Sequence, residues 1–81
     1  MIRIEARLYA TLRKYHLGGK VGEALVRELA EGTTVQELLQ KELGLPPGEV
    51  KTVFVNGLSR SFDHVLADGD RVGIFPPVAG G

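Results

Sequence analysis

From Ile2 to Leu8, apolar and charged side chains alternate without a break. Successive side chains of a β-strand point to opposite faces, so this pattern predicts a strand with one buried face and one face in water. Such a strand belongs to a sheet that is covered on one side only. The chain of 81 residues has room for one domain with a small core, which must supply both the partner strands and the covering element.

The covering element is predicted to be a helix that begins after Thr34. Thr34 and Glu37 have the spacing of a capping box at a helix start. Gly44 stands where a left-handed cap would end the helix, and Leu45 is placed to fold back on the last turn. The two prolines that follow prevent continuation. Apolar residues recur on one face of this helix at Val35, Leu38, Leu39 and Leu43.

Further strands are predicted at residues 23–30, 50–55, 58–62 and 71–75. Residues 23–30 also fit a short helix, but their length and the neighbouring glycines favour a strand. Asn56-Gly57 predicts a tight hairpin, and residues 68–70 predict a turn before the last strand. Residues 9–22 are expected to form a loop with a helical turn at its start. The order of elements predicts an α+β domain in which one helix packs on one face of a small mixed sheet.

Composition excludes several classes of function. The chain has no cysteine, which rules out disulfides, thiolate metal sites and a catalytic thiol. Ten basic and ten acidic residues give zero net charge, which argues against a general nucleic-acid or membrane binder. No apolar run approaches membrane-spanning length, and the alternating start does not resemble a signal peptide. A cytoplasmic protein is therefore expected.

No active site within the chain is predicted. His16 and His64 are far apart in the sequence and lack metal-ligand spacing, so we expect no metal or cofactor to be bound. Asp63, Asp68 and Asp70 lack the 12-residue ligand pattern of a calcium loop and are better explained by turns. The sequence also contains no nucleophile elbow and no Gly-rich phosphate loop.

The sequence ends FPPVAGG, and this tail is the candidate functional segment. Pro76 and Pro77 have no backbone N–H, so the hydrogen-bond ladder of the last strand cannot continue, and we divide the chain into a domain, residues 1–75, and a flexible tail, residues 76–81. A tail of this length reaches roughly 19 Å in an extended polyproline conformation. Gly80 and Gly81 lack a Cβ and would fit a narrow channel, presenting the terminal carboxylate to a partner. The alternative is a frayed end without function.

These features resemble the ubiquitin-like β-grasp sulfur carriers, most closely the small subunit of molybdopterin synthase. The most specific part is LADGDRVGIFPPVAGG, residues 66–81, supported by the opening strand, the Leu12-Arg13 pair, TVQELL and VFVNG. The Pro76-Pro77 pair favours the molybdopterin branch over the thiamine branch. Lys14, where the family often has an acidic residue, and the long loop at 9–22 depart from the family pattern.

The resemblance implies a function at the C-terminus. An E1-like adenylating enzyme would use ATP and Mg²⁺ to activate the carboxylate of Gly81, and a persulfide on a donor protein would convert it to a thiocarboxylate. The chain would be non-catalytic alone and would serve the large subunit of molybdopterin synthase in a heterotetramer. The tail residues that would enter the partner channel are Pro76, Pro77, Val78, Ala79 and Gly80.

Partner docking is expected on the uncovered face of the sheet. Phe75 is a candidate docking residue or a core residue with nearly equal weight, whereas Phe54 is predicted to be core. Arg13 and Lys14, in a basic loop with His16 and Lys20, could contact an acidic partner surface or simply face solvent.

Two other readings of the function are open at this point. The sulfur acceptor could instead belong to thiamine, thiolated tRNA or cysteine synthesis, or the tail could be joined to lysines as a protein modifier. In a reading of another class, the chain is a non-covalent β-grasp binding module with an inert tail.

Overall fold

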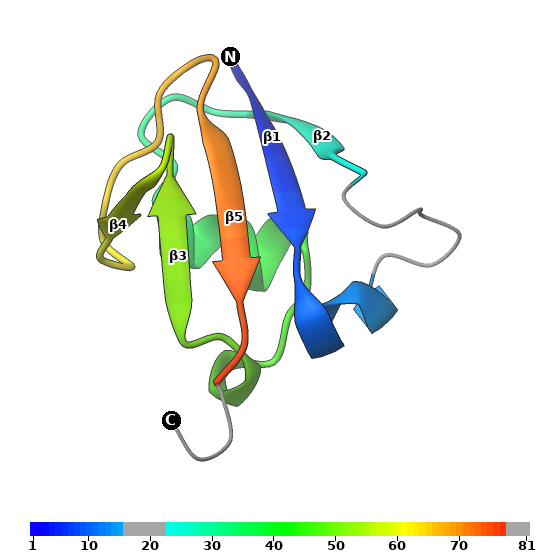
Figure 1. The fold of residues 1–81 in the computed structure, drawn as a ribbon. Helices are drawn as coiled ribbons and strands as arrows, with labels where there is room; N and C mark the ends of the chain where they lie inside the picture. Colours follow the sequence, from blue (N-terminus) through cyan, green and yellow to red (C-terminus); the bar gives the residue numbers. More distant parts are fainter. Residues whose placement is uncertain (16–22, 78–81) are drawn as a thin grey trace.

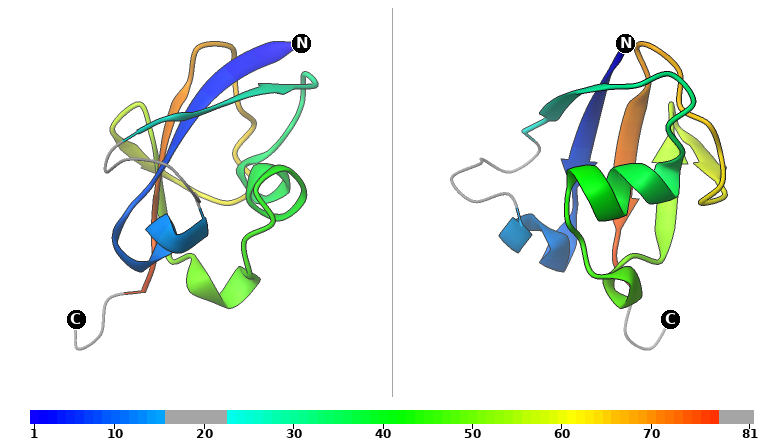
Figure 2. Two further views of the ribbon diagram at one scale, coloured as in Figure 1. Left: turned by 90° about the vertical axis from the view of Figure 1, so that its right-hand side faces the viewer. Right: turned by 180° about the vertical axis from the view of Figure 1, so that it is seen from behind.

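The computed structural model describes residues 1–15 and 23–77. They form one mixed sheet in the strand order β2-β1-β5-β3-β4, with a helical segment lying across one face (Figures 1 and 2). β1 and β5 are parallel, and the other neighbouring pairs are antiparallel. The strands are β1 (Ile2–Leu8), β2 (Leu25–Leu29), β3 (Thr52–Val55), β4 (Leu58–Arg60) and β5 (Arg71–Phe75). This is the predicted α+β fold with a covering helix on one side.

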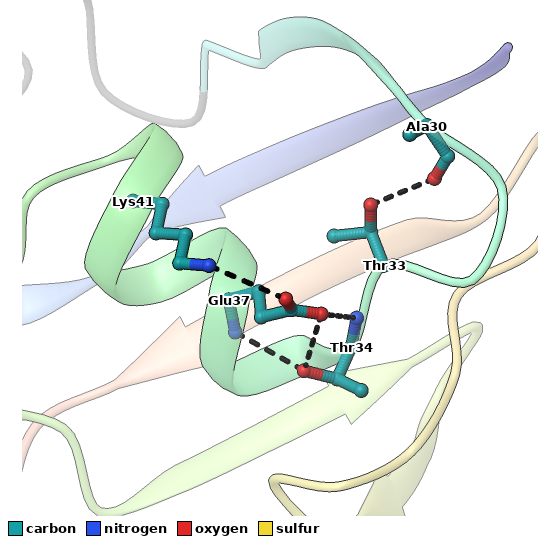
Figure 3. A network of polar contacts seen from close by, with 5 residues as sticks. All are labelled: Ala30, Thr33, Thr34, Glu37 and Lys41. Atoms are coloured by element: carbon teal, nitrogen blue, oxygen red, sulfur yellow. Dashed lines mark hydrogen bonds and ion pairs between the residues drawn. The ribbon is translucent and has the colours of Figure 1, made fainter.

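The helical segment starts as the sequence predicts. The Thr34 hydroxyl accepts a hydrogen bond from the Glu37 N–H at 3.2 Å, and the Glu37 carboxylate accepts one from the Thr34 N–H at 3.0 Å (Figure 3). This capping box opens α1 (Val35–Glu37). Lys41 adds an ion pair to Glu37 at 3.6 Å one turn later. The predicted start of the helix is therefore confirmed in its hydrogen bonds.

Beyond Glu37 the helix is wider than a regular α-helix. Residues Leu38–Glu42 form the π-helical turn η2, in which the Leu43 N–H bonds to the Leu38 carbonyl at 3.0 Å. Gly44 is left-handed, with a φ of 64°, and the Leu45 N–H returns to the Leu39 carbonyl at 2.9 Å. The predicted glycine cap and the return of Leu45 are confirmed. Two short 3-10 helices complete the chain, η1 (Ala10–Tyr15) and η3 (Pro47–Glu49).

A single apolar layer fills the space between the sheet and the helical segment. Because strand side chains alternate, the apolar set of β1 points toward the helix and the charged set points away. The same alternation places Val53, Val55, Val72 and Ile74 in the core beneath Val35 and Leu38. The opposite face of the sheet, which faces the viewer in Figure 1, has no helix over it among the described residues.

The hairpin after β3 forms as predicted, but its second strand is shorter. Asn56 and Gly57 both have positive φ, at 53° and 84°, as a tight hairpin turn requires. β4 ends at Arg60 rather than at Phe62, because the chain then turns toward the helix. The carbonyls of Phe62 and His64 accept hydrogen bonds from the first N–H groups of the helical segment at 2.8 and 2.9 Å. These N–H groups have no partner within the helix, so the return segment caps the helix and does not extend the sheet.

Within residues 1–15 and 23–77, no helix has the length and apolar character needed to cross a membrane.

Candidate functional site

The last strand, β5, occupies the centre of the sheet between β1 and β3. Its end is held from both sides: the Ile74 carbonyl accepts a hydrogen bond from the Tyr9 N–H at 3.1 Å, and the Phe75 carbonyl accepts one from the Lys51 N–H at 2.9 Å. Pro76 is still buried, and Pro77 is exposed. The start of the tail at Pro76 is therefore held at a fixed point of the domain, and the division after residue 75 stays a prediction.

The predicted tail residues Val78, Ala79, Gly80 and Gly81 lie outside the described residues. Their roles in the partner channel and in sulfur loading stay predictions. The structure describes where this segment departs, which is the edge of the domain that carries η3 (Figure 1).

Three aromatic rings gather on the uncovered face of the sheet, next to the start of the tail. The rings of Tyr9 and Phe75 stack with centroids 4.5 Å apart and an interplanar angle of 4°. Phe54 meets Phe75 edge-on at 5.5 Å. We call these three residues the aromatic patch. All three are half-buried, so each offers part of its ring to solvent or to a partner.

The prediction that Phe54 is a core residue is wrong. Val53 and Val55 on either side of it point toward the helix and are buried, so Phe54 must point to the opposite face. Phe75, predicted as a docking or core residue, lies on the same open face. Continuing the alternation of the strands would have placed both residues there.

A bare glycine lies in the middle of the aromatic patch. Gly73 of β5 is paired in register with Phe54 on one side and with Arg7 on the other. A Cβ at this position would lie 3.4 Å from a ring carbon of Tyr9 and 3.5 Å from one of Phe75. The missing side chain leaves an open hollow of about 400 Å³, which we call the Gly73 hollow. It is lined by Arg7, Tyr9, Phe54, Gly57, Arg71, Val72, Gly73 and Phe75.

The sequence analysis missed Tyr9, Arg71 and Gly73 as site residues. Tyr9 continues the odd-numbered, outward-facing positions of β1 beyond the strand end. Arg71 and Gly73 share the outward face with Phe75, because the residues between them are buried. The signal was thus present in the alternation of each strand, but bringing the residues together required the strand order.

Arg13 and Lys14, the predicted basic docking residues, are exposed on η1. Lys14 is paired with Glu49 of η3 at 3.5 Å, and its ammonium lies 5.3 Å from the centre of the Tyr15 ring. The Tyr15 hydroxyl donates a hydrogen bond to the same Glu49 carboxylate. This hydrogen bond is the main cause that raises the pKa of Tyr15, with smaller effects of burial and of the Glu49 charge. Lys14 is thus partly neutralised within the chain, and the docking roles of Arg13 and Lys14 stay predictions.

Among the described residues, no group of three or more His, Asp or Glu side chains is arranged to hold a metal ion. His64 is half-buried and contributes its backbone carbonyl to the helix start, whereas His16 and Lys20 lie outside the described residues.

Comparison with known proteins connects these features to one group. A profile of the ThiS family matches residues 7–81. The molybdopterin synthase sulfur carrier subunit of Escherichia coli (strain K12) is 39% identical to this chain over 69 residues, and the similarity covers 75% of this chain and 84% of that protein.

Solved structures have the same fold. The putative molybdopterin converting factor subunit 1 from Pyrococcus furiosus superposes with a TM-score of 0.74 at 29% identity, covering 96% of this chain and 100% of that chain. A complex of subunits 1 and 2 of the molybdopterin-converting factor from Helicobacter pylori gives a TM-score of 0.63 at 22% identity, covering 99% of this chain and 100% of the matched chain. At that identity the second similarity shows the fold alone. The arrangement of sheet and helix is the ubiquitin-like β-grasp fold.

Proposed function

This chain belongs to the ThiS family, and from that premise we propose that it is a sulfur carrier for molybdopterin synthesis, loaded at the carboxylate of Gly81. The observation that carries the proposal is the similarity to a sulfur carrier subunit of molybdopterin synthase over most of both chains. The geometry of β5 supports it, because this central strand is held on both sides at its end and so fixes the position of Pro76, from which the tail continues.

The chemistry takes place on the terminal carbonyl carbon, since the chain has no thiol. A free α-carboxylate is anionic at neutral pH and resists nucleophiles. An E1-like partner would therefore use ATP and Mg²⁺ to form an acyl-adenylate at Gly81. The terminal sulfur of a persulfide on a donor protein then attacks the carbonyl carbon, so that a C–S bond forms while the C–O bond to AMP breaks. A thiol reductant cleaves the donor's original S–S bond, forms a disulfide with the donor sulfur and leaves the thiocarboxylate on Gly81.

The body of the domain provides recognition in this proposal. The aromatic patch lies on the open sheet face, and its member Phe75 directly precedes Pro76. A partner that docks on the patch would find the start of the tail at a fixed place, with the tail pointing into its active site. The partner would be the large subunit of molybdopterin synthase, in a heterotetramer with two copies of this chain, and the tail would give its sulfur to a pterin precursor bound by that subunit.

Intact-mass measurement tests the loading step. The protein is incubated with ATP, Mg²⁺, an adenylating enzyme and a persulfide donor. We expect the mass change of one oxygen atom replaced by one sulfur atom. A variant that lacks Gly81 should keep the fold, as followed by circular dichroism, and should show no change. An unchanged mass for the wild-type chain under conditions that load a known carrier would contradict the proposal.

The acceptor is tested separately. The loaded protein is offered to the large subunit of molybdopterin synthase with its pterin precursor, and to the thiazole-forming and tRNA-thiolating enzymes. Sulfur uptake by the first alone is the expected result. Uptake only by one of the others would keep the carrier function and reject the molybdopterin pathway.

A further inference from the structure

The Gly73 hollow has an apolar floor and aromatic walls. Gly73 and Val72 form part of its base on β5, and the rings of Tyr9, Phe54 and Phe75 stand around it. The Gly73 backbone is held in ladders with strands on both sides, so the base cannot move without breaking the centre of the sheet. A site with these walls favours an apolar side chain, which would be removed from water on several sides.

The hollow is also held open before any partner arrives. Tyr9 and Phe75 are stacked on each other, and Phe54 meets Phe75 edge-on, an arrangement that aromatic rings prefer. A ring of side chains that already contact one another loses little conformational freedom when it binds. The hollow therefore has the properties of a preformed socket.

The charges around the hollow have one sign. Among the described residues that line it are the two arginines Arg7 and Arg71, and none of these described residues is an Asp or a Glu. Glu5 is in register with Arg71, but it lines a neighbouring hollow with Asp68 and Asp70. A partner segment that enters the Gly73 hollow thus meets the guanidinium group of exposed Arg71 next to the aromatic walls, and guanidinium groups pair well with carboxylates.

We propose that the Gly73 hollow is the specificity pocket of the docking face. It receives an acidic partner segment that places one apolar side chain over Gly73 and a carboxylate beside Arg71. This inference rests on the proposed function, because the partner is taken to be the large subunit of molybdopterin synthase. Beyond that function, the inference names the residues of this chain that select the partner, and it names the groups on the partner that they bind: an apolar side chain and a carboxylate.

The hollow lies directly beside the start of the tail, so binding of a partner there would also affect how the tail is positioned. Phe75 forms one wall of the hollow, and the next residue, Pro76, is the buried start of the segment that leads to Gly81. A partner side chain seated on Gly73 is therefore held against the last residue before the tail. Recognition and delivery of the tail are coupled through a single strand end.

Two substitutions test the two halves of the proposal. Gly73→Ala adds a methyl group at the base of the hollow, where a partner side chain would sit, and this methyl group makes only ordinary contacts with Tyr9 and Phe75, so the fold should tolerate it. Arg71→Glu reverses the charge beside the hollow at an exposed position. Binding of the large subunit of molybdopterin synthase is measured by titration calorimetry at low and high salt. We expect each variant to bind about tenfold more weakly, as interface hot-spot residues do, and Arg71→Glu to lose most of the salt dependence.

Matched controls make the same chemical changes away from the hollow. Gly48→Ala adds a methyl group where nothing lies within 4 Å of the new atom. Arg60→Glu reverses a charge on β4 at a position in register with the inward-facing Val53, on the other side of the sheet. Both should bind within about twofold of the wild-type chain, as surface changes outside an interface do. Thermal unfolding of all four variants confirms that they are folded.

Either test variant binding as tightly as the wild-type chain would overturn the proposal, as would equal losses in the controls. Failure of the underlying function gives a different result, because the wild-type chain itself would then not bind the large subunit or would not change mass in the loading reaction.

Discussion

Asp70 is a buried carboxylate that joins two turns. It accepts hydrogen bonds from the Asn56 side chain at 2.9 Å and from the Ala67 N–H at 2.8 Å. The Asn56 side-chain oxygen in turn accepts the Arg71 N–H at 2.9 Å. The hairpin after β3 is thus tied to the turn that precedes β5. Sequence analysis identified both segments as turns but did not connect them, because they are separated along the chain.

We predict that Asp70→Ala destabilises the domain by about 2 to 3 kcal/mol, since the hydrogen bonds that the Asn56 side chain and the Ala67 N–H donate to a buried, charged carboxylate are lost. Asp68→Ala is the matched control, because Asp68 is exposed and accepts one hydrogen bond from the Arg3 N–H. Guanidinium-induced unfolding measures the free energy of unfolding of both variants and of the wild-type chain. If both variants lost the same small amount of stability, the buried position of Asp70 would be shown to be unimportant.

Glu37 makes helix stability depend on pH. Hydrogen bonds from Thr34, the backbone first and the side chain next, lower the pKa of Glu37 below its ordinary value of 4.5, and Lys41 adds to the effect. A carboxyl with a lowered pKa stabilises the folded state above its unfolded pKa, and the contribution is lost as pH falls through the folded pKa.

The expected result is that Glu37→Gln is less stable than the wild-type chain at neutral pH and that the difference shrinks as the pH falls below 4.5. Thermal unfolding from neutral to acidic pH measures this. Glu42→Gln, at the other end of the helical segment and on an exposed residue, serves as the comparison. A constant difference for Glu37→Gln at all pH values would refute the role of its charge.

At the level of elements, a polar contact connects η1 with η3. Tyr15 and Lys14 of η1 both engage Glu49 of η3, and Tyr15 also packs against the core. The chain reaches Lys51 two residues after Glu49, and Lys51 holds the end of β5. The two short helices therefore flank the point where the tail begins. Their pairing was not predicted, since no local pattern links residue 15 to residue 49.

This contact is tested by the titration of Tyr15. The sequence has two tyrosines, Tyr9 and Tyr15. In a Tyr9→Phe variant, the phenolate signal therefore comes from Tyr15 alone. Its phenol should titrate above pH 10, and Glu49→Gln should bring it closer to the ordinary value. Because the pKa of Tyr15 is raised, the contact stabilises the fold below pH 10 and is lost as the pH rises through the folded pKa. Ultraviolet absorbance follows the phenolate, and an unchanged titration in Glu49→Gln would rule out the contact in solution.

For the molecule as a whole, the proposed function separates recognition from chemistry. The aromatic patch and the Gly73 hollow lie on the folded body, whereas the reacting carbon is proposed to be at Gly81. The helical segment covers the other face of the sheet (Figure 2). This division suits a carrier that meets several enzymes in turn, because each partner can bind the same face and receive the same tail.

The division predicts that Gly80→Leu blocks loading while leaving docking intact. A leucine side chain adjacent to the reacting carboxylate should be excluded from a narrow partner channel, so the rate of adenylation should fall by at least about a hundredfold, as misplacement of a reacting group does. Pyrophosphate release measures adenylation, and calorimetry with the adenylating enzyme measures docking. Val65→Leu is the control, since Val65 is exposed on the segment after β4. Normal adenylation of Gly80→Leu would exclude a narrow channel.

The amino-acid sequence by itself determined the features that depend on neighbouring residues: the alternation of β1, the capping box at Thr34, the left-handed Gly44 and the Asn56-Gly57 hairpin. Each results from backbone geometry or hydrogen bonds over a few residues, so the local pattern is sufficient. The tertiary structure alone decided which strands are neighbours. By placing β5 between β1 and β3, it brought Tyr9, Phe54 and Gly73 onto one face. Contacts between strands distant in sequence depend on the packing of the whole sheet against the helix, and no local pattern specifies them.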